Sequence, residues 1–187
     1  MTDSVSDKLV EEVVRRVLAE MKDAAPAPAP AAPKPERIRP EVLTGTIGLM
    51  VYRPDAKVEA ALASAARGGV VFRGYSESTC EITNALAMCK AVSAGDVAGG
   101  VLLDRHAAAG VALAGKVRGI RPVQGVSVAA VLAGLRQFNA NVLVIGHAQA
   151  SVYEIRTMID RFASARRMGR DRTALLDTIE QLEADST

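Results

Sequence analysis

The chain has 187 residues, 49% of them hydrophobic and 24% charged, which suits one α/β domain with an appended segment. Its net charge of +2, with three tyrosines, three phenylalanines and no tryptophan, argues against nucleic-acid binding, which uses clustered cations or stacking aromatic rings. No apolar run approaches the length of a membrane span, and the N-terminus lacks the continuous apolar core of a secretory signal, so we expect a cytoplasmic protein.

The first predicted element is an amphipathic helix within residues 1–22. Apolar residues recur about every fourth position along one side, and charged residues of both signs fill the other side. The apolar stripe includes Leu9, Val13, Val17 and Met21. Because such a stripe needs an apolar partner, the helix is expected to bind another surface.

An Ala/Pro-rich linker follows, over residues 23–45. Six of the eight prolines fall within positions 26–40, and proline-rich segments are extended and stiff. The linker is therefore expected to hold the helix away from the main domain, residues 46–187.

The segment SDKLVEEVVRRVLAEM (residues 6–21) with this linker resembles the encapsulation peptides that direct enzymes into bacterial microcompartments. The resemblance implies that residues 1–22 bind microcompartment shell proteins and that the protein lies inside such a compartment. An oligomerisation helix, or a helix folded onto its own domain, is the alternative. A membrane-surface helix is disfavoured because the charges of the polar face nearly cancel.

From residue 46 onward, short apolar strands alternate with helices, which predicts a parallel sheet covered by helices on both faces. The fold class is therefore α/β, Rossmann-like, a three-layer sandwich. The predicted strands are residues 47–52, 70–72, 101–103, 121–123 and 141–145, and the later helices are residues 82–92, 126–138, 151–165 and 173–183. Cys80 and Cys89 fall in a helical pattern and are expected to be small core residues.

The stretch from residue 97 to 121 holds the candidate site. Its apolar strand stops at Asp104, Arg105 and His106, and a helix of small residues follows. Ligands of parallel sheets bind beyond the carboxyl ends of strands, where a helix N-terminus attracts anions. An ordinary solvated loop with a charged cap is the alternative. His147 follows another strand at the same rim, where it either faces the pocket or is solvated.

Nucleotide-binding signatures are missing from these strand ends. No strand precedes a Gly-rich dinucleotide fingerprint or a Walker-type lysine motif, which disfavours NAD, FAD and ATP.

Four segments carry a second resemblance: KVRGIRPV, FNANVLVIG, IRTMIDRF and MGRDR, in that order between residues 116 and 172. They resemble the ribose-5-phosphate isomerase B and galactose-6-phosphate isomerase family. The resemblance implies a five-stranded parallel sheet, a homodimer or tetramer with the site shared between subunits, and aldose–ketose isomerisation of a small phosphorylated substrate through an enediolate. It implies neither a cofactor nor a metal.

The family's base and its surroundings are replaced in this chain. The family has an Asp-His pair after the first strand, where this chain has Tyr52 and Arg53. Its base, a cysteine, aligns with Asp104, and its oxyanion-binding glycines align with residues 105–109. Side chains at those glycine positions limit the approach of a substrate to the backbone.

The family's ring-opening and phosphate-binding residues are also partly replaced. The His-Asn pair that opens the sugar ring falls on Gln137 and Phe138. Of the phosphate-binding arginines, Arg170 is present, with Arg172 near enough to assist.

Three interpretations stay open. In two of them the protein is an isomerase, for the family's standard substrates or for another small phosphorylated or carbonyl compound. Asp104 then replaces the thiol as base, His106 serves ring opening, and Arg53, Arg105 and Arg170 attract the anion. In the third, the protein is a non-catalytic small-anion-binding or scaffold protein of the compartment lumen.

Overall fold

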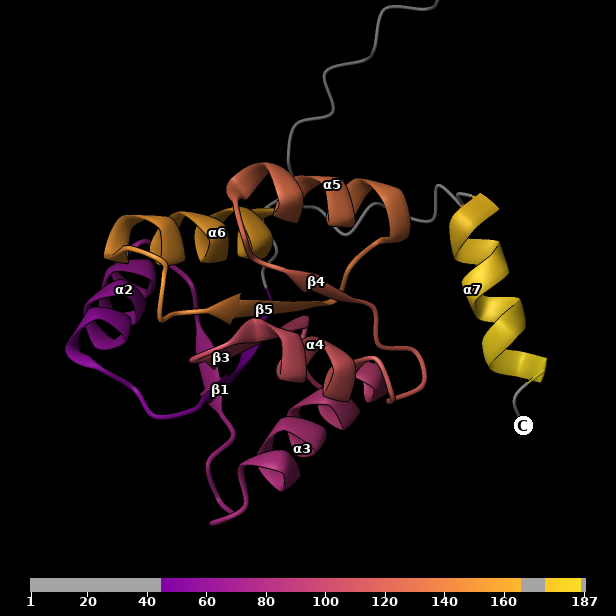
Figure 1. Ribbon diagram of the computed structural model, residues 1–187, viewed down its shortest axis with the longest axis horizontal. Coiled ribbons are helices and arrows are strands. Elements are labelled where there is room, and N and C mark those ends of the chain that lie inside the picture. Colours follow the sequence, from indigo (N-terminus) through magenta and orange to yellow (C-terminus); the bar gives the residue numbers. More distant parts are fainter. Residues whose placement is uncertain (1–44, 166–173, 186–187) are drawn as a thin grey trace, which may run out of the picture. The chain divides into compact units, whose positions relative to one another are not determined.

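The computed structural model describes residues 45–165 and 174–185 (Figure 1). The predicted encapsulation helix with its stripe (Leu9, Val13, Val17 and Met21) and the linker lie outside the described residues. So do Arg170 and Arg172.

The main domain contains a five-stranded, fully parallel sheet in the order β2-β1-β3-β5-β4. Its elements are β1 (Ile47–Val51), α2 (Ala56–Arg67), β2 (Phe72–Gly74), α3 (Glu81–Ala94), β3 (Gly99–Asp104), α4 (Ala107–Ala114), β4 (Pro122–Gln124), α5 (Val128–Phe138), β5 (Val142–Gly146), α6 (Val152–Ser164) and α7 (Ala174–Asp185). Helices α2, α5 and α6 pack on one face of the sheet, and α3 and α4 pack on the other (Figure 1). The predicted α/β, Rossmann-like fold is confirmed.

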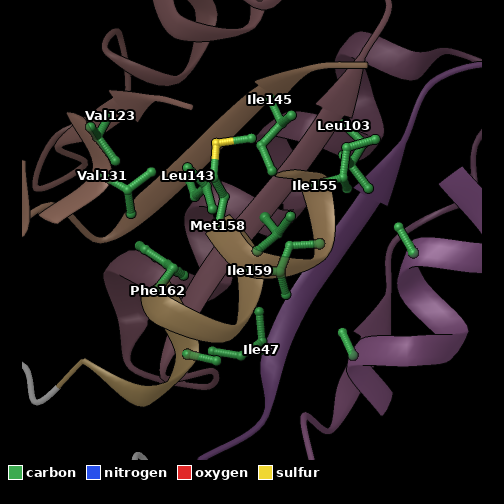
Figure 2. Close-up of a cluster of buried hydrophobic side chains, with 14 of the residues drawn as sticks. Ile47, Leu103, Val123, Val131, Leu143, Ile145, Ile155, Met158, Ile159 and Phe162 are labelled. Carbon is green, nitrogen blue, oxygen red and sulfur yellow. The ribbon is translucent and has the colours of Figure 1, made fainter. Parts of the chain in front are cut away.

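The larger core lies between the sheet and helices α2, α5 and α6. Figure 2 shows Leu143 and Ile145 of β5 beside Ile155, Met158 and Ile159 of α6, all of them at most 1% exposed. The alternate residues of β5 point into the second core, against α3 and α4. A strand buried on both faces needs apolar residues at every position, which explains the uninterrupted run in this strand.

Helix α4 packs tightly against the sheet because its residues are small. A Cβ atom at Gly110 would lie 2.9 Å from side-chain atoms of both Leu102 and Val144. The close packing brings the start of α4, and the turn that precedes it, against the carboxyl ends of β3 and β5.

Two predictions need correction. Strand β2 is Phe72–Gly74 rather than residues 70–72; it is an edge strand, and Val71 before it is 62% exposed, so apolar character does not fix its register. Cys89 is buried as expected, whereas Cys80 is exposed at the N-cap of α3. None of the helices within the described residues has the length and hydropathy of a membrane span.

Candidate active site

The candidate site lies where the chain leaves the sheet in opposite directions. After β1 the chain passes to α2 on one face, and after the neighbouring strand β3 it passes to α4 on the other face (Figure 1). Such a switch point opens a crevice at the carboxyl ends of the two strands. The predicted residues Tyr52, Arg53, Asp104, Arg105 and His106 all lie at this edge.

Asp104, the last residue of β3, opens into a cavity of about 220 Å³. Its half-buried carboxylate shares the cavity with Tyr52 and Glu81, and the other walls are apolar side chains of β1, β3, α3 and α4. The structure therefore brings two of the predicted residues, Tyr52 and Asp104, to one cavity.

Arg105 and His106 line a second and larger cavity, of about 420 Å³. Its polar wall also includes the first turn of α4 together with Gln124 and Gln149. His106 is the N-cap of α4 and its side chain is exposed. The two predicted catalytic residues, Asp104 and His106, thus face different cavities that share the β3–α4 turn.

Arg53 holds an uncommon backbone conformation directly after β1. Its φ of 45° lies in the left-handed region, which non-glycine residues adopt at a cost. Its guanidinium carbon lies 5.1 Å from the centre of the Tyr52 ring, within cation–π range. Both residues lie in the turn that directly follows the carboxyl end of β1.

His147 is buried, with 4% of its surface exposed, so the expectation of a solvated histidine is wrong. Its Nε2 lies 3.2 Å from the Tyr52 carbonyl oxygen, and its backbone N–H donates to the Asp104 carbonyl (2.8 Å). Its Nδ1 lies 3.6 Å from a carboxylate oxygen of Asp55. One sequence signal could have shown this: position 147 continues the alternation of Leu143 and Ile145, which face the larger core.

Asp55 is the N-cap of α2, and its environment favours its charged form. The backbone N–H of Val58 donates to its side chain (2.9 Å). This hydrogen bond is the largest cause of the lowered pKa of the Asp55 carboxyl, and the neighbouring Lys57 and His147 contribute less. The carboxylate beside His147 is therefore held charged at neutral pH.

Gln137 lies away from both of these cavities. It is in the last turn of α5, which runs antiparallel to the strands and therefore ends near their amino ends, opposite the candidate site. Its neighbour Phe138 lines a different cavity, of about 770 Å³, at that end. Within one chain, Gln137 does not join Asp104.

The described residues were also searched for a metal site. Among the described residues, no group of three or more His, Cys, Asp or Glu side chains could hold a metal ion.

These features define an α/β protein with a polar site at the switch point of a parallel sheet, the place where such folds bind small ligands. The comparisons with known proteins then give the family. Residues 57–179 match the ribose/galactose isomerase family, and the chain belongs to this family. A search of curated proteins finds no match.

Solved structures of ribose 5-phosphate isomerases share the fold. The enzyme from Thermotoga maritima has a TM-score of 0.65 at 17% identity, over 74% of this chain and 99% of that one. The type B enzyme from Trypanosoma cruzi has a TM-score of 0.66 at 21% identity, over 76% of this chain and 98% of that one. Isomerase B from Clostridium thermocellum has a TM-score of 0.64 at 18% identity, over 76% of this chain and 99% of that one. About a quarter of this chain lies outside each match.

Proposed function

We propose that the protein is an aldose–ketose isomerase for a sugar phosphate, or for a related small phosphorylated carbonyl compound, and that a carboxylate replaces the family's thiol base. Membership of the ribose/galactose isomerase family supports the reaction class. One observation carries the assignment of the base: the half-buried carboxylate of Asp104 ends the central strand β3 and opens into a cavity at the switch point.

In the proposed reaction, Asp104 takes the proton from C2 of the open-chain aldose. The electron pair of the C–H bond forms a C1–C2 double bond, and O1 becomes the oxyanion of an enediolate. Return of the proton to C1, with transfer of the O2 proton to O1, gives the ketose. One proton moves from C2 to C1 and one from O2 to O1, and no external electron donor or acceptor takes part, so the net reaction needs no cofactor.

The larger cavity supplies the proposed anion-binding half of the site. The Arg105 guanidinium and the first-turn N–H groups of α4 can hold a phosphate or an enediolate oxygen. We assign ring opening to His106 because it is the exposed one of the chain's two histidines and can exchange protons with a ligand. Arg53, in the turn after β1, is proposed to attract the anion, as are Arg170 and Arg172.

Gln137 can reach the substrate only from a second copy of the chain, since it lies at the opposite end of its own sheet. Its proposed role as a substrate-binding residue therefore goes together with a homodimer, or a tetramer, in which two chains share a site. Sedimentation of the purified protein tests the assembly.

The test of the function is a paired measurement on the full chain. Ribose 5-phosphate and galactose 6-phosphate are incubated with the protein, aldose-to-ketose conversion is followed, and the thermal shift is recorded with each compound. Conversion supports the proposal. A shift without conversion supports the second candidate, a small-anion-binding protein, which the separation of the Arg105 and Asp104 cavities favours. If the protein shows no conversion and no thermal shift, both candidate functions are contradicted for these two sugar phosphates.

We further propose that residues 1–22 direct the protein into a bacterial microcompartment. The support is the apolar stripe and the stiff linker in the sequence. Replacing Val13 and Val17 by glutamate breaks the stripe and should release the protein from co-purified shells, whereas Glu12→Gln on the charged side should not. Retention of the Val13→Glu, Val17→Glu variant would contradict the targeting role.

A further inference from the structure

His147 contacts two of the residues that line the Asp104 cavity, Tyr52 and Asp104 itself. It follows β5, and its side chain reaches across the end of β3 to the end of β1. Its ring nitrogen Nε2 meets the Tyr52 carbonyl (3.2 Å), and its backbone N–H donates to the Asp104 carbonyl (2.8 Å). The Tyr52 N–H in turn donates to the Leu103 carbonyl (2.7 Å). One buried residue therefore joins the ends of three neighbouring strands.

The hydrogen-bonding partners fix where the ring carries its proton. A carbonyl oxygen only accepts, so the contact with Tyr52 places a proton on Nε2. In the neutral ring Nδ1 then has a lone pair and no proton. Among the described residues this buried atom has no hydrogen-bond partner, and a carboxylate oxygen of Asp55 lies 3.6 Å away. A second proton on the ring would convert Nδ1 into a donor that faces Asp55.

Helix α2 holds the same segment from the other side. Lys57 donates from its ammonium group to the His147 carbonyl (2.6 Å), and Asp55 caps the helix. Two contacts thus join the start of α2 to His147: Lys57 contacts its backbone carbonyl, and Asp55 lies near its ring nitrogen Nδ1. The charged groups on the segments around His147 are Arg53, Asp55, Lys57, Asp104 and Arg105.

We infer that His147 is a positioning residue of the active site: its ring holds the turn that carries Tyr52 against the end of β3, whose Asp104 faces the same cavity. The positioning follows from the contacts of His147 alone, whereas its effect on catalysis rests on the proposed isomerase function. Removing the Nε2 donor would leave the Tyr52 carbonyl without its partner and free the turn after β1 to move. Misplacement of reacting groups by about 1 Å can cost on the order of 100-fold in rate.

Two substitutions separate the donor from the shape of the ring. His147→Phe keeps an aromatic ring and loses the donor, whereas His147→Gln keeps an N–H group at a similar reach. We expect His147→Phe to lower kcat by about tenfold to a hundredfold with little change in KM, and His147→Gln to recover most of the loss. Equal kcat in His147→Phe and the unsubstituted protein would overturn the catalytic part of the inference.

Asn141, which directly precedes β5 at the amino ends of the strands, provides a matched control. It is also buried (7% exposed), and its side chain accepts from the Arg121 N–H and donates to the Gly119 carbonyl, both at 2.8 Å. Asn141→Leu should lower stability and leave kcat unchanged. If it lowers kcat as much as His147→Phe does, His147 has only a general structural role.

Magnetic resonance of the intact protein tests the positioning without any enzyme assay. The chain has two histidines, and the exposed His106 serves as internal reference. We expect the neutral ring of His147 to carry its proton on Nε2. A proton on Nδ1 in the neutral ring would overturn the inference.

Amide hydrogen exchange keeps the inference and the proposed function separable. Exchange of the Tyr52 N–H should be faster in His147→Phe and unchanged in Asn141→Leu. If the intact protein isomerises neither sugar phosphate, the proposed function fails for these substrates, and the exchange rates and the position of the ring proton still decide the positioning role. Slow Tyr52 exchange in a folded His147→Phe variant would refute that role whatever the activity.

Discussion

Substitution of Asp104 by asparagine tests the proposed base with almost no change of shape. A general base contributes about 10²- to 10⁴-fold to a rate, which corresponds to about 2.7 to 5.4 kcal/mol of activation free energy. The fold should tolerate the change, because the Asp104 side chain is half-buried and the hydrogen bond that its backbone carbonyl accepts from His147 stays intact. We therefore expect a stability change within about 0.5 kcal/mol and a melting shift below about 2 °C.

The assay compares kcat/KM for aldose-to-ketose conversion with thermal unfolding of the same samples. Asp96→Asn is the matched control, since it removes the same charge from an exposed loop between α3 and β3. It should retain full activity. If Asp104→Asn keeps more than about a tenth of the activity, Asp104 is not the base, and if its melting temperature falls in step with its activity, the loss reports damage to the fold.

The remaining predictions concern acid and thiol chemistry. The hydrogen bond from the Val58 N–H lowers the pKa of Asp55 in the folded state, so its stabilising effect is present above the ordinary carboxyl pKa and is lost as pH falls through the folded value; Asp55→Asn should flatten this part of the acid unfolding profile. A hydrogen bond from the Thr83 hydroxyl lowers the pKa of the exposed Cys80 thiol, whereas burial raises that of Cys89 to about 11. Iodoacetamide at neutral pH should therefore label Cys80 first and Cys89 only on unfolding, and mass spectrometry reporting the reverse order would contradict this.

The order and class of the elements could be predicted because burial and capping act locally. The strand expected at residues 141–145 is Val142–Gly146, and the helix expected at 151–165 is Val152–Ser164. Ser151 begins that helix with a capping box in which Glu154 bonds back to the Ser151 backbone. Edge strand β2 lacks such constraints, because one neighbour and partial exposure leave its register to tertiary packing.

The site was less predictable because the strand ends within the polar cluster, between Asp104 and Arg105. Asp104 is the last residue of β3 and lines the cavity on the α3 and α4 face, whereas Arg105 and His106 belong to the turn after the strand, where side chains no longer alternate between the two faces, and line the cavity near β4 and β5. The sequence groups these three residues as one cluster. The structure assigns them to two cavities that share a turn.

The reverse holds for His147 and Tyr52, which lie 95 positions apart and are in contact. Parallel strands joined by helical crossovers bring residues from distant parts of the chain to one edge of the sheet, and the strand order β1-β3-β5 decides which of them meet. Because β3 lies between β1 and β5, a side chain from the end of β5 can reach β1 only by crossing β3. That crossing accounts for the burial of His147, and it makes the geometry of the Asp104 cavity depend on a residue that lines neither cavity.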